Sequence, residues 1–374
     1  MQRNALTIGR ILGIPIRIHT SWFLIFVLVT WSLATGYFPQ RYPLWPGGQS
    51  WAVGLATSLL FFLSVLLHEL AHALVARWWG MPIHDIVLFI FGGVAELTEE
   101  PERPRIEFFM ALVGPLTSFA LAILFLIIWL FARRSAEPLA ALSIYLAGMN
   151  ASLGGFNLIP GFPLDGGRVL RSLLWGATNN LEKATRWATG VGQAVAYLFI
   201  LLGALQAIRG QWASGIWIAF IGWFLENTAQ TSYRQVAFRA MLQGYKVEQV
   251  MTRECHPLSP DITLEALVRN YILPLGLRCF PVVVDGAIQG VVSVPLIKKV
   301  PEESWPMVTV RAVTLPLEQV GYVRPADSLW MALNRMTSEQ REQLPVSDGD
   351  GQFVGVLTYD QVMRFIQQHS RLRI

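Results

Sequence analysis

The sequence has few charged residues. Asp, Glu, Lys and Arg make up 14% of its 374 residues, whereas about a quarter is usual for a soluble domain. Hydrophobic residues make up 53%, and the mean hydropathy is +0.44. This composition, with 14 Trp and 21 Phe, excludes a disordered chain and a collagen-like repeat. It indicates a protein that lies in lipid.

Cysteine and lysine are scarce as well. The two cysteines, Cys255 and Cys279, cannot form the disulfide framework of a small secreted module, so we expect free thiols in a reducing compartment. Lysine is absent before Lys183. The positive residues form no continuous stripe, which argues against nucleic acid as a partner.

Long apolar stretches are the main feature that is present. Each is long enough for a helix to cross the hydrocarbon core of a bilayer. The sequence predicts six such spans, near residues 20–38, 51–79, 108–131, 139–158, 188–208 and 212–231. The first span lacks a small-residue cleavage site behind a short apolar core, so we expect no removable signal peptide and an N-terminus that stays attached.

The positive residues predict the orientation in the membrane. With six spans, both termini lie on the same side. Most Lys and Arg residues near the spans fall on that side: Arg3, Arg10, Arg17, Arg77, Arg103, Arg105, Arg168, Arg171, Lys183, Arg186, Arg234, Arg239 and Lys246. Only Arg41, Arg133, Arg134 and Arg209 fall on the other side. Because cytoplasmic loops are rich in Lys and Arg, both termini are predicted to be cytoplasmic.

Two stretches in the membrane part have β-strand character. The alternating isoleucines of residues 14–18 predict a short strand, and residues 87–97, interrupted by Gly92 and Gly93, predict a hairpin or a re-entrant loop. Backbone that is not helical is tolerated at membrane depth only against protein or water. A cavity inside the protein is therefore expected.

The second span carries the HExxH motif His68-Glu-Leu-Ala-His72. Residues four apart share one face of a helix, so both imidazoles can bind one tetrahedral Zn²⁺ while Glu69 lies beside its open position. Glu69 can then take a proton from a water held there. Ionisable residues at mid-membrane cost roughly 2–3 kcal/mol each, which argues for a function. The alternatives are a chance match and a hydrogen bond in helix packing.

A tetrahedral catalytic site needs a third protein ligand. Asp165 is the only carboxylate in residues 157–168, where Pro160, Pro163 and several glycines interrupt the helix after the fourth span. The interruption lets the chain turn and direct the Asp165 side chain back into the bundle. The alternative is an aspartate that caps the helix beginning near Arg168.

Together these motifs resemble the site-2 protease family of intramembrane zinc metalloproteases. The resemblance covers roughly residues 1–235 and rests on the HExxH helix, the glycine loop at 91–95 and the Asn-x-x-Pro-x-x-Pro-Leu-Asp-Gly motif at 157–166. It implies that His68, His72 and Asp165 bind zinc and that Glu69 activates the water.

The resemblance also implies how substrate binds. Gly92, Gly93 and Val94 would pair with an unwound segment of the substrate, and Asn157 would donate a hydrogen bond to the substrate or to the developing oxyanion. Asn150 is a weaker polar candidate. The usual substrates are single-span regulatory membrane proteins, whose cleavage releases a cytoplasmic signalling fragment.

A second domain follows a linker at residues 236–246, where the charge density rises. Residues 247–374 contain two repeats, about 247–300 and 309–368, in which Phe280-Pro-Val-Val-Val recurs as Leu344-Pro-Val-Ser. Each repeat is predicted to run helix, strand, turn, strand, helix. The repeat resembles a tandem pair of CBS domains, a module that often binds adenine nucleotides and can form a homodimer.

The nucleotide-binding members of that family usually place an acid three residues after the Ser or Thr of the last strand. Here Leu296 and Gln361 stand at those positions, and Asp360 comes one place early. ATP or AMP binding therefore stays open beside a dimerising or substrate-docking module without ligand.

The expected fold is a polytopic α-helical membrane protein, with six transmembrane helices and short β-strand or re-entrant elements, plus a soluble α/β tandem CBS domain. The expected function is an intramembrane zinc endopeptidase with a regulatory CBS pair, located in a prokaryotic cytoplasmic membrane. A CBS-regulated transporter or channel is the alternative, and it predicts matching broken segments in two membrane halves. Residues 1–235 contain no such repeat. A catalytically silent scaffold would lack Glu69 or a ligand, and all four residues are present.

Overall fold

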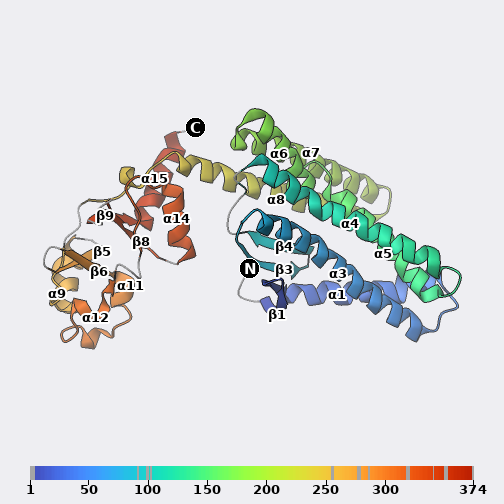
Figure 1. Cartoon of the computed structure of the whole chain (residues 1–374), viewed down its shortest axis with the longest axis horizontal. Helices are drawn as coiled ribbons and strands as arrows, with labels where there is room; N and C mark the ends of the chain where they lie inside the picture. Colours follow the sequence, from blue (N-terminus) through green and yellow to red (C-terminus); the bar gives the residue numbers. More distant parts are fainter. Residues whose placement is uncertain are drawn as a thin grey trace. The chain divides into compact units, whose positions relative to one another are not determined.

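The computed structural model of the chain (Figure 1) divides into two compact units, Met1–Val236 and Ala237–Ile374. It describes residues 5–90, 92–97, 101, 103–253, 257–275, 279–284, 287–316, 321–339, 341–348 and 353–372. Phe91 of the predicted glycine loop and Cys255 lie outside these ranges.

The first unit is mainly helical. Its first long helix starts as α1 (Thr20–Ser32), continues through a π-helical turn at Leu33–Tyr37 and ends as α2 (Phe38–Arg41). The other helices are α3 (Gly47–Trp78), α4 (Pro104–Ala132), α5 (Glu137–Asn157), α6 (Asp165–Thr178), α7 (Leu181–Ile208) and α8 (Trp212–Gln243), whose last seven residues belong to the second unit. Proline in the first turn of α4 and of α5 suits a position whose backbone N–H needs no helical partner.

Five helices of the described chain are long and apolar enough to cross a membrane. They are Thr20–Arg41, α3, α4, α5 and α7. The helical membrane fold is thus confirmed, but the count of six spans is not. The sixth predicted span falls on α8, which has 32 residues but carries Glu226, Asn227 and Gln230 around its middle. These polar residues lower its hydropathy.

A four-stranded sheet accompanies the helices, in the order β1 (Ala5–Ile11), β2 (Ile14–His19), β3 (Ile83–Phe89) and β4 (Gly92–Leu97). The strand predicted at residues 14–18 is β2. The segment at residues 87–97 is a hairpin, because β3 and β4 pair antiparallel. β2 and β3 pair in parallel, with Ile16 opposite Ile86.

The sheet packs against the helix that carries the HExxH motif. Ile14 and Ile16 of β2 and Ile86 of β3 are buried in one cluster with Leu70 and Ala73 of α3. Burying these apolar side chains together stabilises the contact and leaves little freedom for the strands to slide. The β3–β4 hairpin is therefore held beside the C-terminal half of α3.

The second unit consists of two similar halves. The first contains α9 (Leu264–Leu267), a π-helical turn (Val268–Ile272), α10 (Leu273–Leu275), β5 (Cys279–Val284), β6 (Ala287–Ser293) and α11 (Val294–Ile297). The second contains α14 (Leu329–Ser338), β8 (Gln343–Ser347), β9 (Phe353–Thr358) and α15 (Tyr359–Leu372). Shorter elements are the 3₁₀ turns Val247–Gln249 and Glu302–Ser304, α12 (Val310–Val313) and β7 (Leu315–Pro316).

Backbone pairing repeats between the halves. Leu258 pairs in parallel with Val282 of β5, and Val323 pairs in parallel with Val346 of β8. Val247 is the exception to a simple tandem order, because this residue from the start of the first repeat is buried in the hydrophobic core of the second half. The segment that precedes the first half thus packs against the second half.

Candidate metal centre

Three donor atoms from two helices meet in the first unit. The Nε2 atoms of His68 and His72 on α3 lie 3.2 Å apart, and each is 3.2 Å from Oδ2 of Asp165 in the first turn of α6. A tetrahedral zinc site with bonds of about 2.0–2.1 Å has about 3.3 Å between its ligand atoms. The three atoms therefore form one face of a tetrahedron of the size that zinc requires.

Glycine lets Asp165 reach this position. A Cβ atom on Gly166 or Gly167 would overlap backbone atoms of the loop at residues 158–162. Only glycine allows the loop to fold this closely onto the beginning of α6. The two residues directly after Asp165 thus direct its carboxylate toward α3.

Helix α4 holds both imidazole rings from behind. His72 Nδ1 lies 2.6 Å from the backbone oxygen of Met110, and His68 Nδ1 lies 2.9 Å from Oγ of Ser118. When each Nδ1 donates its proton to these acceptors, the Nε2 lone pairs are left for a metal. The outer hydrogen bonds therefore orient the rings as metal ligands require.

Gly114 of α4 lies directly against the donor atoms. A Cβ atom at this position would overlap the ring of His72 and would lie 2.8 Å from His68 Nε2. Our reading of the sequence did not identify Gly114, Met110 or Ser118. The available signal was the Gly114-Pro115 pair inside an otherwise apolar helix.

The carboxylate of Asp165 is held in its charged form. Burial alone raises its pKa, but the positive charge that His72 and His68 carry when they are protonated, together with the hydrogen bonds from both rings, outweighs this, so the pKa lies well below its usual range. An ionised carboxylate is the form that binds a metal ion.

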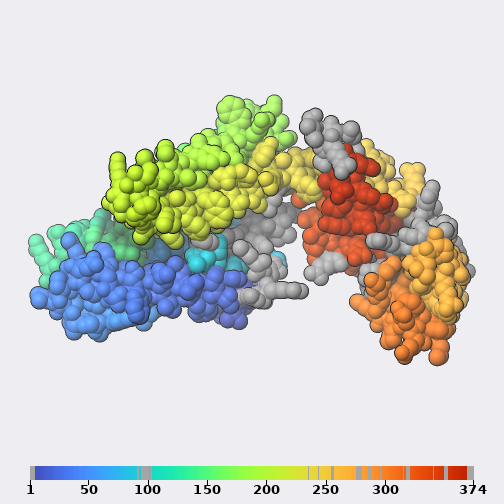
Figure 2. Space-filling view, turned by 180° about the vertical axis from the view of Figure 1, so that it is seen from behind, coloured from blue at the N-terminus to red at the C-terminus, as the bar shows by residue number. Residues whose placement is uncertain are grey.

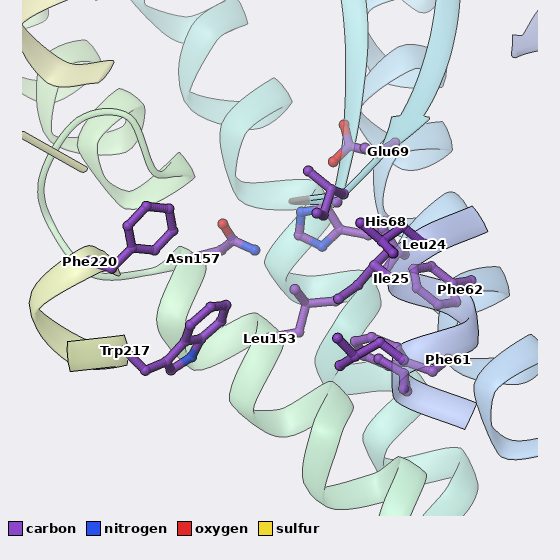
Figure 3. A pocket seen from close by; sticks show the side chains of 16 residues that line it. Leu24, Ile25, Phe61, Phe62, His68, Glu69, Leu153, Asn157, Trp217 and Phe220 are labelled. Atoms are coloured by element: carbon purple, nitrogen blue, oxygen red, sulfur yellow. The ribbon is translucent and has the colours of Figure 1, made fainter. Parts of the chain in front are cut away.

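A cavity of about 890 Å³ opens beside the donors (Figure 3). His68, Glu69 and Asn157 contribute polar side chains to its wall, and Asn157 lies across the cavity from Glu69. The other lining residues in the described part of the chain are apolar or glycine: Leu24, Ile25, Leu28, Val29, Phe61, Phe62, Val65, Ile90, Gly92, Gly93, Leu153, Trp217 and Phe220. The cavity therefore suits an apolar ligand with a polar group at one end.

Some of the predicted site residues line the cavity, and two of the donor residues do not. His68 and Glu69 line the cavity, whereas His72 and Asp165 lie behind His68 and are not among the lining residues. Gly92 and Gly93 line the cavity too, and a Cβ on Gly93 would lie 3.2 Å from Cδ of Glu69. The sheet thus touches the residue beside the metal donors.

Two further candidates are Val94 and Asn150. Val94 belongs to β4, and only its backbone is described. Asn150 is fully buried, and its Nδ2 donates to Oγ of Ser64 at 3.3 Å and to the backbone oxygen of Leu146 at 2.9 Å. Asn150 therefore joins α5 to α3 and does not face the cavity.

Comparisons with known proteins identify the family. The model of peptidase family M50 matches residues 56–142 and 132–202, and the CBS domain model matches residues 247–297 and 310–368. A Mycobacterium tuberculosis protein named putative zinc metalloprotease Rip3 is 34% identical over 368 residues, which cover 97% of this chain and 93% of that protein. The chain belongs to peptidase family M50, the site-2 proteases. This family membership confirms the resemblance found in the sequence.

Two further relatives of this M50 peptidase are similar over much of its length. The Synechocystis protein named putative zinc metalloprotease sll0528 is 34% identical over 368 residues, covering 97% of this chain and 96% of that protein. The solved structure of the site-2 protease from Methanocaldococcus jannaschii is 31% identical, with a TM-score of 0.42, and covers 61% of this chain and 94% of that chain. The M50 peptidase is thus a multi-pass membrane zinc metalloprotease that carries CBS domains.

Proposed function

We propose that this chain hydrolyses a peptide bond within or near the transmembrane helix of a single-span regulatory membrane protein. The observation that supports this proposal is the triangle of donor atoms of His68, His72 and Asp165, of which His68 lines an apolar cavity. In the proposed enzyme these three residues hold zinc, which when bound supplies a Lewis acid and lowers the pKa of water.

Glu69 and Asn157 carry out the proton transfer and the charge stabilisation in this proposal. Glu69 takes the proton of the attacking water and delivers it to the nitrogen of the scissile bond, so that the amine leaves uncharged. The amide of Asn157 donates a hydrogen bond to the carbonyl oxygen as negative charge develops on it. Both side chains line the same cavity, which supports their acting on one bond.

The substrate helix must unwind before it can be cut, because its carbonyl groups are engaged in helical hydrogen bonds. We propose that the freed backbone pairs with β4, along Gly92, Gly93 and Val94. Among the strands that the structure describes, β4 lies at the edge of its sheet, and an edge strand can pair with an added strand. The apolar wall of the cavity would receive the side chains of the unwound segment.

We propose further that both termini and the CBS pair are cytoplasmic and that the CBS pair regulates the protease. In this proposal the pair binds ATP or AMP and joins two copies of the chain. The match of both halves to the CBS domain model supports a regulatory module. The mass of the purified particle should be measured over a range of protein concentrations. A mass that corresponds to one copy of the chain at every concentration would contradict the homodimer.

The enzymatic proposal is tested with Glu69→Gln. Cleavage of a candidate single-span substrate should fall by about 10²–10⁴-fold, because the base is lost. The zinc content of the purified variant should equal that of the wild type, because Glu69 is not a donor in the triangle. As a matched control, His72→Ala should lose both zinc and cleavage. Undiminished cleavage by Glu69→Gln would remove this residue from the mechanism.

A further inference from the structure

A buried ion pair joins α4 to α6, the helix that supplies Asp165. Arg171 Nε donates to Oε1 of Glu107 at 2.6 Å, and its Nη2 donates to the same oxygen. The side chain of Glu107 is 0% exposed and that of Arg171 is 5% exposed. Arg168 adds a weaker contact, with its Nε 3.9 Å from Glu107 Oε1.

Arg171 also contacts the loop in front of Asp165. Its Cζ lies 5.0 Å from the centre of the Phe162 ring, and Phe162 is buried. A guanidinium that stacks on an aromatic ring and donates two hydrogen bonds at once has a well-defined orientation. Arg171 therefore ties three parts together: α4, α6 and the loop that ends at Asp165.

The third donor depends on helix docking in a way that the other two do not. His68 and His72 belong to one helix, so their spacing follows from helix geometry. Asp165 belongs to a separate helix, and its 3.2 Å distances to both imidazoles hold only while α6 keeps its place. A displacement of α6 by about 1 Å would exceed the tolerance of about 0.2 Å in the distance between zinc and its ligands.

Helix α4 is the common support of all three donors. Glu107, Gly114 and Ser118 lie on one buried face of α4, since they are seven and four residues apart. Ser118 holds His68 at one end of this face, and Glu107 holds Arg171 of α6 at the other. Because buried ion pairs add little to stability over apolar packing, a role in geometry explains the pair better.

We infer that Glu107 and Arg171 are positioning residues that hold α6 so that Asp165 completes the metal site. This inference rests on the proposed function, in which the three donors bind zinc. Neither residue touches the donor atoms, and both act through the position of Asp165.

Zinc affinity of the purified full chain tests the inference without any substrate. Competition with a chromophoric chelator should show that Glu107→Gln weakens zinc binding about 10- to 100-fold, the range seen for residues that orient metal ligands. The matched control is Asp85→Asn, which breaks the buried pair of Arg17 Nη1 and Asp85 Oδ2, 2.9 Å apart, between β2 and β3. This control should leave zinc affinity unchanged. Equal losses in both variants would overturn the inference.

A double-mutant cycle separates positioning from general damage. In an Asp165→Asn chain, adding Glu107→Gln should cause no further loss of zinc affinity, because the residue through which it acts is already gone. Losses that simply add would overturn the inference. If Glu107→Gln shows no cooperative thermal unfolding transition, the variant is not folded, and Arg171→Lys is measured in its place. Lysine keeps the positive charge but lacks the two guanidinium donors.

The same titrations distinguish this inference from the proposed function. A wild-type chain that binds no zinc, or whose binding is unaffected by His68→Ala, would contradict the proposed function itself. A wild-type chain that binds zinc through His68 but is insensitive to Glu107→Gln would contradict only the positioning role.

Discussion

At the scale of single residues, the donors could be predicted but their supports could not. His68 and His72 share a helix face and have the spacing of the HExxH motif, which can be recognised in the sequence alone. Asp165 followed from the helix-breaking prolines and glycines around it. Met110 and Ser118 were missed, because they act through tertiary contacts between helices and carry no local pattern of their own.

Gly114 offers a residue-scale prediction. Gly114→Ala should remove zinc binding, because the added methyl group would occupy the space of the His72 ring and force the donors apart. Elemental analysis of the purified chain checks this. The matched control is Gly148→Ala on α5, where a Cβ would meet no atom within 4 Å, and this variant should bind zinc like the wild type. A Gly114→Ala protein with a full complement of zinc would contradict the role of α4 as the wall of the site.

At the scale of elements, apolar length predicted the membrane helices well. The predicted stretch at residues 108–131 became α4, Pro104–Ala132, and the stretch at 139–158 became α5, Glu137–Asn157. The parallel pairing of β2 with β3 could not be predicted, because strands separated by the whole of α3 leave no local signal of their partner. Alternation of side chains predicts a strand but not its neighbour.

The packing of α8 bears on the sixth span. α7 and α8 lie against each other on the surface of the first unit (Figure 2). A Cβ on Gly203 of α7 would lie 2.5 Å from the backbone N of Ala219, and one on Gly222 of α8 would lie 2.6 Å from the backbone oxygen of Ala196. Small residues that let two backbones approach so closely are typical of helix pairs in membranes. This contact supports a crossing by α8 despite Glu226.

A crossing by α8 predicts the side of each loop. In intact cells with Cys255 and Cys279 replaced by serine, a membrane-impermeant maleimide should label Gln211→Cys, between α7 and α8. It should not label Asn179→Cys, before α7, or Lys298→Cys in the second unit. All three positions are exposed, so any difference reports the barrier of the membrane. Labelling of Lys298→Cys from outside would place the CBS pair on the outer side, and labelling of both Lys298→Cys and Gln211→Cys would exclude a crossing by α8.

At the scale of the whole molecule, the internal repeat predicted a second domain of two halves. It could not predict that Val247 is buried with the second half, because two similar repeats offer the entering segment similar partners. The pairing of Thr252 with Val356 of β9 could not be predicted for the same reason. A repeat in the sequence thus predicts that the domain has two similar halves. It does not predict which half a connecting segment packs against.

The nucleotide proposal for the CBS pair leads to a gain-of-function prediction. Gln361 caps α15: its Oε1 accepts from the backbone N of Thr358 at 2.9 Å, and Oγ1 of Thr358 accepts from the backbone N of Gln361 at 3.3 Å. Nucleotide-binding CBS domains usually carry an acidic residue at the position of Gln361. Gln361→Asp should therefore bind ATP or AMP about five- to tenfold more tightly, because a carboxylate is a stronger acceptor for ribose hydroxyls than an amide.

Calorimetric titration of the full chain measures this gain. Aspartate also suits the first turn of a helix, so the variant should keep the fold of α15. The matched control is Gln368→Asp, the same chemical change at an exposed position near the end of the same helix, and it should leave affinity unchanged. If neither the wild type nor Gln361→Asp releases heat with either nucleotide, the CBS pair acts without one, and its regulatory effect must come from joining two copies or from docking the substrate.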